Sequence, residues 1–290
     1  MIKKDQKVGN ILGVSLYSTH KRKVLEKVLF DIKSEDKLLI VTPNPEIVLR
    51  AQEDKLLMSI LNRADISIAD GIGLVAWNKF LHLPNPKDPF KRALTLFVQA
   101  LGVSFSIMFS KKWLFSDLSP LKGRDVAYSL VELAHKKGLK LFLLGGEHGE
   151  ARKAQLALKK NFPSLKVSAF AGPMLNSGAK PISVQDTKLE KMAISKINSF
   201  APDILLVGMT TPRQEKWLYQ WLPKVNAKVG MTVGGTFKYF GGDEVLPPKW
   251  IDDLGLAWLF RLLSGAQSVD RITKAVWEFP AKVFWYKFTH

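Results

Sequence analysis

The 290-residue sequence contains no cysteine and few histidines, and these absences exclude whole classes of site. Without thiols the chain can form neither disulfides nor thiolate metal centres. None of the histidines has the spacing of a zinc ligand set. The five are His20, His82, His135, His148 and His290. The sequence therefore offers no recognisable metal-binding motif.

The sequence also lacks a secretory leader, internal repeats and low-complexity segments. The start MIKKDQKVGN is basic, but no apolar stretch follows it as a signal peptide would require, which favours the cytoplasm. Acidic residues are scarce: 26 Asp and Glu stand against 43 Lys and Arg, giving a net charge of +17. This balance indicates an anionic partner, which can be nucleic acid, anionic lipid or a polyphosphate substrate, or else a generally basic proteome.

Short apolar runs alternate with helical patterns over most of the chain. Runs such as LKLFLL and DILLVGM are continuous, as in parallel strands covered on both faces. Their alternation with helices predicts an open, mainly parallel α/β sheet. The predicted strands are Ile11–Tyr17, Lys37–Thr42, Ile66–Ala69, Leu139–Leu144, Lys166–Phe170, Asp203–Met209 and Lys228–Val233. The predicted helices are Lys21–Lys33, Pro45–Leu61, Arg124–Lys137, Glu150–Phe162, Thr187–Phe200 and Pro212–Lys224.

Two stretches interrupt this alternation. Within residues 81–122, the segment Ala93–Ser110 carries 18 residues without a charge, and Lys111, Lys112 and Trp113 follow it. This length just spans a bilayer core, but polar residues dilute the segment, so an interfacial helix or hairpin, a true span and a buried insertion all stay open.

The second stretch is the tail, residues 245–290, which holds four of the eight Trp residues. Its aromatic and basic residues interleave on short helical segments, a pattern that suits a membrane surface. A terminal helical pair that packs its aromatic residues on the core is the alternative. Single-stranded nucleic acid also binds such surfaces, but no recognised nucleic-acid motif accompanies the pattern, so no nucleic-acid partner is expected.

An acidic residue directly follows one predicted strand. The segment ISIADGIG places Asp70 after the strand and before Gly71 and Gly73. Ligands of open α/β sheets bind beyond the carboxyl ends of the strands, where Asp70 can act as a general base. The two glycines leave room for a substrate and begin a helix whose N–H groups favour anions. Equally, Asp70 can be the N-cap of that helix.

The segment IVTPNPE has the same arrangement at the end of another predicted strand. Thr42 and Asn44 occupy the turn, and Pro45 suits the first position of the next helix. Both polar side chains can hydrogen-bond a sugar hydroxyl, while Asn44 can equally cap the helix.

Glycine-containing turns follow three further strands. Gly145 and Gly146 allow a phosphate to approach the backbone closely, although the segment matches neither GxGxxG nor the Walker pattern, and a tight turn without a ligand is the alternative. Gly234, Gly235 and Thr236 follow a later strand in the same way. Together with the turn in LLVGMTT, these segments favour a bound nucleotide.

The most distinctive stretch is LLVGMTTPRQEKW. Its strand ends at Gly208–Met209, and more polar groups crowd the start of the next helix than one helix cap needs. We therefore expect this group to bind substrate. Its members are Thr210, Pro212, Arg213, Gln214 and Glu215.

Taken together, these segments resemble the WecG/TagA/CpsF glycosyltransferases, which form glycosyltransferase family 26. The match covers nearly the whole chain except residues 81–122 and keeps the family order. The matching segments are TPNPE at 42–46, ADGIG at 69–73, GRD at 123–125, LFLLGG at 141–146, ILLVGMTTPRQEKW at 204–217 and VGGTF at 233–237.

The resemblance implies a Rossmann-like core with helices on both faces of the sheet over residues 1–244 and a C-terminal helical appendage at 245–290 that binds the membrane. It implies inverting transfer of N-acetylmannosamine or a related sugar from a UDP-sugar, without metal or cofactor. The implied acceptor is a polyprenyl-diphosphate-linked amino sugar, used in teichoic acid or other cell-surface polysaccharide synthesis. The enzyme would sit peripherally on the cytoplasmic face of the membrane, with 93–110 as a candidate inserted helix.

By the same resemblance, Asp70 is the catalytic base, and Thr42 and Asn44 belong to the active site. Gln214 corresponds to the glutamine of the family's PRQE motif. The tail departs from the family, because its Arg-Ala-Pro segment reads Val245–Leu246–Pro247–Pro248 here. Arg261 and Arg271 remain as candidates to bind the diphosphate.

Two alternatives remain for the function. The same reaction with a UDP-hexose or a uronic acid donor fits the sequence, and so does a catalytically weak membrane scaffold that binds UDP. The sequence also leaves the oligomeric state open, a homo-oligomer included.

Overall fold

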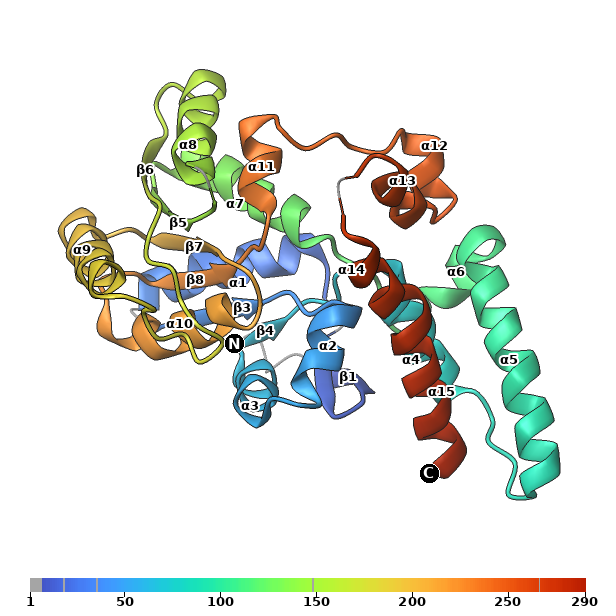
Figure 1. The fold of residues 1–290 in the computed structure, drawn as a ribbon. Helices are drawn as coiled ribbons and strands as arrows, with labels where there is room; N and C mark the ends of the chain where they lie inside the picture. The colour runs from blue at the N-terminus through green and yellow to red at the C-terminus, as the bar shows by residue number, and fades with distance from the viewer. Residues whose placement is uncertain (1–6, 18, 35, 148, 266) are drawn as a thin grey trace.

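The chain folds around one parallel sheet with helices on both faces (Figure 1). The computed structural model describes residues 7–290 except 18, 35, 148 and 266, so the basic start MIKKDQ lies outside the described residues. The sheet has six strands in the order β4-β3-β8-β7-β5-β6, and every neighbouring pair is parallel. The predicted fold class is confirmed. The strands are β3 (Leu38–Val41), β4 (Ile66–Ser67), β5 (Lys140–Gly145), β6 (Lys166–Phe170), β7 (Ile204–Gly208) and β8 (Val229–Thr232).

Successive residues of each strand belong to two separate hydrophobic layers, one on each face of the sheet. Leu143 and Leu206 point to one face of the sheet, while Leu144 and Val207 point to the other, as the two-residue period of a strand requires. The first face is covered by α1 (Lys21–Ser34), α7 (Gly123–Lys137), α8 (Glu150–Asn161) and α11 (Thr236–Gly241). The second is covered by α2 (Pro45–Ala51), α3 (Lys55–Arg63), α4 (Ile72–His82), α9 (Val184–Phe200) and α10 (Arg213–Trp221), followed by η1 (Leu222–Lys224).

Two sequence predictions of local structure were wrong. Residues 11–17 were predicted as one strand but form the antiparallel hairpin of β1 (Lys7–Ile11) and β2 (Val14–Tyr17), outside the main sheet. Its two-residue turn has positive φ at Leu12 and Gly13, the geometry that matches the strand twist. The helix predicted over residues 45–61 is broken, because the Asp54 carboxylate accepts from Leu57 N (3.0 Å) and starts α3.

Residues 81–122 form mainly α5 (Pro89–Phe109) and α6 (Lys111–Leu114). In Figure 1, α5 lies beside α4 and the last helix of the tail, α15 (Phe279–Thr289). The tail begins over the carboxyl ends of the strands and returns along α4. Its remaining elements are α12 (Lys249–Asp253), α13 (Ala257–Leu263), α14 (Val269–Thr273) and the π-helical η2 (Lys274–Glu278).

The aromatic residues of the tail divide into two groups. Phe279 is fully buried, and the Phe284 ring stacks on Phe80 of α4 with ring centroids 6.0 Å apart. The four tail Trp residues stay exposed, from 37% at Trp258 to 73% at Trp277. Packing on the core therefore accounts for the phenylalanines named here, and membrane binding by the tail stays a prediction.

Candidate active site

The segments expected to form the site meet at one edge of the sheet. Because all six strands are parallel, the residues that follow β3, β4, β5, β7 and β8 emerge on the same side. Neighbouring loops are joined by backbone hydrogen bonds, with Asp70 N donating to Pro43 O (2.9 Å) and Gly146 N to Gly208 O (2.6 Å). The fold therefore gathers the predicted site residues that lie at strand ends.

Asp70 lies between the end of β4 and the start of α7. Its Oδ1 accepts from Gly123 N (3.1 Å), the first N–H of α7. Burial raises the pKa of the Asp70 carboxyl, the charge of Asp125 adds to this, and the Gly123 N–H and the charges of Arg261 and Arg124 oppose it. A carboxyl group with a raised pKa at a ligand-binding edge is suited to accept a proton.

Asp70 does not cap the helix that follows it. The N-cap of α4 is Gly71, with φ of 101°, and no side chain caps that helix. The Asp70 carboxylate instead reaches α7, 53 residues further along the chain. Gly73 lies in the first turn of α4, where a Cβ would stand 3.5 Å from the Pro45 ring. Of the two roles open from the sequence, the helix cap is therefore excluded.

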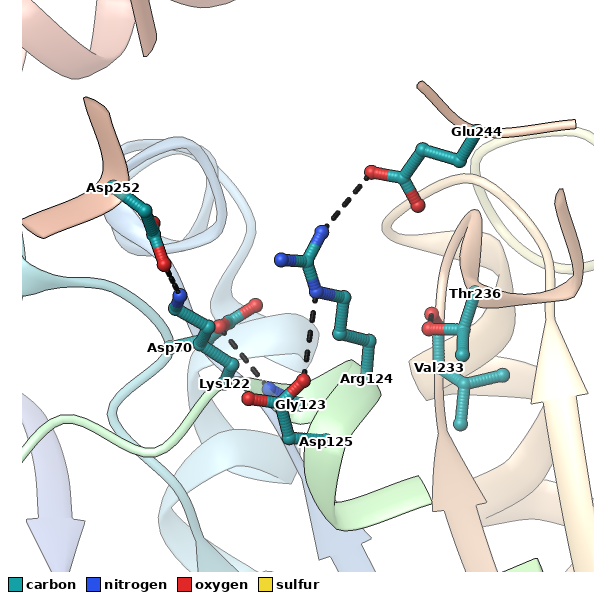
Figure 2. Close-up of polar contacts among 9 residues, drawn as sticks. All are labelled: Asp70, Lys122, Gly123, Arg124, Asp125, Val233, Thr236, Glu244 and Asp252. Carbon is teal, nitrogen blue, oxygen red and sulfur yellow. Dashed lines mark hydrogen bonds and ion pairs between the residues drawn. The ribbon is translucent and has the colours of Figure 1, made fainter. Parts of the chain in front are cut away.

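Two basic side chains, Lys122 and Arg124, lie near Asp70 in Figure 2. Lys122 forms an ion pair with Asp252 of α12, and Arg124 pairs with Glu244 (Nη1–Oε1 3.3 Å). The Arg124 guanidinium also lies 5.5 Å from the centre of the Tyr239 ring of α11. The start of α7 thus carries two cations that face the tail.

Arg261 is the predicted tail residue that reaches this region. It extends from α13, and its charge lowers the pKa of Asp70. Its Nε is buried and has no hydrogen-bond partner among the described residues. Buried polar groups normally have partners, so this Nε–H is a donor suited to an anion beside Asp70.

Thr42 and Asn44 occupy the loop after β3. The Thr42 hydroxyl donates to Thr232 O (3.3 Å), and a Cβ on Gly123 would stand 3.1 Å from Thr42 Cγ2. Glycine at 123 therefore lets the start of α7 approach both Thr42 and Asp70. Asn44 Oδ1 accepts from Ile47 N (2.9 Å) and caps α2, so the capping role is confirmed. Its amide NH₂ carries two further donors.

Gln214 joins the loops that follow β7 and β8. Its Oε1 accepts from Gly234 N (2.9 Å) and Met209 N (3.3 Å), and its Nε2 donates to Glu215 Oε1 (2.7 Å). Glu215 also accepts from the Thr211 hydroxyl (3.1 Å), and burial raises the pKa of its carboxyl. Both residues are almost fully buried. They therefore hold the loops after β7 and β8 in position from the protein interior.

Two of the three remaining residues of this group lie closer to the surface. Arg213 donates through Nη1 to the Thr210 hydroxyl, and Thr210 is exposed. Pro212 precedes α10 directly and is buried. Arg213 and Thr210 are therefore the members of the group that can contact a ligand directly.

Two of the predicted glycine turns differ in the free space around them. Gly145 has φ of 101°, and a Cβ there would stand 2.4 Å from Gly208 O, so close packing of two loops requires this glycine. The Gly146 N–H donates its hydrogen bond to Gly208 O. Around Gly234 and Gly235, by contrast, a Cβ would meet no atom within 4 Å. The open glycine turn is therefore the one after β8, where the Thr236 hydroxyl donates to Val233 O (2.5 Å).

Arg271 lies beside the start of α2. It pairs with Glu46 (Nε–Oε2 2.7 Å), which borders a cavity of about 290 Å³. This cavity is lined by Glu46, Leu49, Arg50, Glu53, Asp54, Ser177, Pro212, Lys274 and Glu278. Four carboxylates outnumber its two cations, which disfavours a diphosphate there. We therefore expect the anion site beside Asp70 instead.

Sequence reasoning missed four charged residues of the site: Lys122, Arg124, Glu244 and Asp252. In the sequence, the GRD segment points to a site only through the family resemblance. The available signal was a run of two cations around a glycine at a helix start, where anions bind. Glu244 and Asp252 carried no such signal in the sequence, because their contacts with Arg124 and Lys122 span 120 and 130 residues. Within the described part of the chain, no group of three His, Asp or Glu side chains could hold a metal ion.

Comparison with known proteins agrees with this geometry. The model of the Glycosyl transferase WecG/TagA/CpsF family matches residues 9–101 and 88–290. Similar proteins occur in Staphylococcus aureus strains MRSA252, MW2 and NCTC 8325, each named N-acetylglucosaminyldiphosphoundecaprenol N-acetyl-beta-D-mannosaminyltransferase. Each is 26% identical over 265 residues, which cover 91% of this chain and 87% of the relative. The chain therefore belongs to the WecG/TagA/CpsF family of glycosyltransferases.

Proposed function

We propose that this glycosyltransferase moves N-acetylmannosamine or a closely related sugar from UDP to a polyprenyl-diphosphate-linked N-acetylglucosamine. The product would serve teichoic acid or another cell-surface polysaccharide. The names of the Staphylococcus aureus relatives supply the two sugars and the polyprenyl diphosphate. The observation that carries the proposal is Asp70, whose pKa is raised by burial, beside the cations Arg124 and Arg261.

Asp70 acts as the general base of a single displacement. The acceptor hydroxyl oxygen attacks the anomeric carbon, its proton passes to the Asp70 carboxylate, and the bond from the anomeric carbon to UDP breaks. Attack from the side opposite the leaving group inverts the anomeric centre. The bond from Gly123 N holds Oδ1 of the carboxylate and leaves Oδ2 to take the proton.

The leaving UDP gains negative charge as its bond breaks. Lys122, Arg124 and Arg261 surround Asp70, and the first N–H groups of α7 add a positive dipole. Phosphate oxygens would replace Glu244 and Asp252 as partners of these cations. With this much positive charge we propose a reaction that requires no metal ion.

The acceptor's lipid places the enzyme at a membrane. We propose a peripheral position on the cytoplasmic face, where the net charge of +17 attracts anionic lipid. The exposed Trp residues of the tail suit the headgroup level.

A panel of UDP-sugars tests the proposal. UDP release is measured with N-acetylmannosamine, N-acetylglucosamine, hexose and uronic acid donors, with and without a polyprenyl-diphosphate-linked N-acetylglucosamine. We expect acceptor-dependent release with UDP-N-acetylmannosamine. Faster release with a hexose or uronic acid donor would reassign the sugar, and UDP binding without release from any donor would indicate a non-catalytic scaffold.

A further inference from the structure

Helix α5 has a buried face and an apolar exposed face. Leu96 and Val103 are fully buried in the core that α4 and α15 share. Seven large apolar side chains on the opposite side are each more than half exposed: Phe90, Leu94, Phe97, Val98, Leu101, Phe105 and Phe109. Such a contiguous apolar surface on an otherwise charged protein marks an interaction site.

The length and composition of α5 alone would permit it to cross a bilayer. Pro89–Phe109 is the one helix in the described part of the chain that is long and apolar enough, with 11% of its most apolar 18-residue window buried. The packing of its inner face decides between a span and a surface position.

The buried face of α5 contacts residues of the tail along its whole length. Near the start of α5, Arg92 donates to Phe288 O (3.0 Å) at the end of α15. At its middle, the buried Lys287 ammonium of α15 donates to Gln99 Oε1 (3.0 Å) and Leu83 O (2.8 Å). Near its end, Ile107 packs so closely on Gly255 that a Cβ there would stand 2.7 Å from Ile107 Cγ2. A span would break all of these contacts, so α5 as packed here can meet a membrane only from its exposed side.

Cations flank the exposed face at both ends. Lys87 and Lys91 are exposed at the start of α5, and Lys112 is exposed at the start of α6. Trp113 follows, 39% exposed. Apolar side chains framed by lysines and a tryptophan match the boundary between anionic headgroups and acyl chains.

The end of α5 also adjoins the active site. Lys111 donates to Asp252 O (3.3 Å), and the Asp252 carboxylate pairs with Lys122, the residue before Gly123, which binds Asp70. A membrane in contact with α5 would thus lie beside α12, which pairs with Lys122 next to the bond between Gly123 and Asp70.

We propose that α5 lies in the plane of an anionic membrane, with its exposed apolar face at the boundary between headgroups and acyl chains. This position presents the active site to a lipid-linked acceptor at the same surface. The role of the contact in catalysis rests on the proposed function, but the contact itself is measurable without any reaction.

The first test compares two triple variants in vesicle cosedimentation. One replaces Phe97, Leu101 and Phe105 with Gln, which preserves helix propensity. The matched control replaces three exposed apolar residues on distant helices with Gln, namely Phe30, Leu156 and Met192 of α1, α8 and α9 (Figure 1). Vesicles contain phosphatidylcholine with or without 30% phosphatidylglycerol.

Burying one such side chain is worth about tenfold in an equilibrium constant. Because the α5 variant loses three such side chains, we expect it to bind anionic vesicles on the order of 1,000-fold more weakly, while the control binds as the parent does. Equal binding by the α5 variant and the parent would overturn the proposal. The proposal would also be overturned if the parent and the control formed dimers without lipid and the α5 variant were monomeric. The exposed face of α5 would then bind a second copy of the chain.

The second test measures orientation and uses the absence of native cysteine. The variants Leu94→Cys, Leu101→Cys and Phe109→Cys each carry an environment-sensitive fluorophore, and lipid-borne quenchers report its depth. An in-plane helix places all three labels at one shallow depth. A deep label at 101 between two shallow ones indicates a span and contradicts the proposal.

Activity assays keep this proposal separate from the proposed function. The α5 variant should lose turnover of long-chain acceptor in vesicles but keep turnover of a short-chain, water-soluble acceptor. If no acceptor is used by any variant, the proposed function fails, while the vesicle data still decide the position of α5.

Discussion

Replacement of Gln214 by Ala probes how the site is held together. The side chain is 3% exposed, and its amide joins Gly234 N, Met209 N and Glu215 Oε1. The substitution leaves two backbone N–H groups without this acceptor and removes a donor from a buried carboxyl group. The glycine turn after β8 would then lose its connection to the loop after β7.

The structure sets the size of the effect. An N–H left unsatisfied in the protein interior costs about 1–3 kcal/mol. The bond to Gly234 is short and the bond to Met209 is long, so we expect unfolding free energy to fall by about 2–4 kcal/mol. Gln155 provides the matched control, because it is equally buried and donates to Val167 O (2.8 Å) on the far side of β5.

Replacement of Gln214 by Glu adds a pH test. It keeps the acceptor oxygen but sets a second carboxyl group against Glu215, so the pair holds one proton more readily in the folded state than in the unfolded state. The folded pKa of the pair is then raised above the ordinary 4.5. Stability is fully present below pH 4.5 and falls as pH rises through that raised pKa.

Urea unfolding followed by circular dichroism and UDP binding by calorimetry measure these effects. We expect Gln214→Ala to lose both stability and UDP affinity and Gln155→Ala to lose stability alone. A Gln214→Ala protein of parental stability that no longer binds UDP would refute the reasoning, because the side chain would then act on the ligand directly.

Three further changes test individual parts of the site. Arg124→Gln should lower kcat about 100-fold through lost charge stabilisation, with Arg22→Gln, the same change at an exposed arginine of α1, as a control that keeps activity; an unchanged kcat would remove Arg124 from the reaction. Gly123→Val should push α7 away from Thr42 and cost about 1–3 kcal/mol of stability, and an unaltered melting curve would argue against this packing. EDTA should leave transfer intact, so loss of transfer that Mg²⁺ or Mn²⁺ restores would show that the reaction needs a metal.

Much of the fold could be predicted because its signals are local. Short apolar runs located the six sheet strands; Thr42 directly follows β3, and Asp70 lies three residues after the end of β4. The hairpin of β1 and β2 was missed because Leu12 stands at a turn position that glycine or asparagine usually occupies.

Contacts between distant segments could not be predicted. The bond from Gly123 to Asp70 joins residues 53 positions apart, and the packing of α5 on α15 joins the two stretches that interrupted the α/β pattern. In the same way, Arg261 was a candidate only by resemblance, and the fold of the tail brings its charge to Asp70. Such placements depend on the tertiary arrangement of the whole chain.

The most direct test of the account is the transfer reaction catalysed by the parent and by Asp70→Asn. Transfer from UDP-N-acetylmannosamine to polyprenyl-diphosphate-linked N-acetylglucosamine is followed across pH. We expect activity of the parent to rise with pH through an apparent pKa above the ordinary 3.8 of an Asp. Asp70→Asn should fold and bind UDP normally but lose activity by about 10²–10⁴-fold at every pH. Parental turnover and an unchanged pH profile in Asp70→Asn would show that Asp70 is not the base and contradict the account.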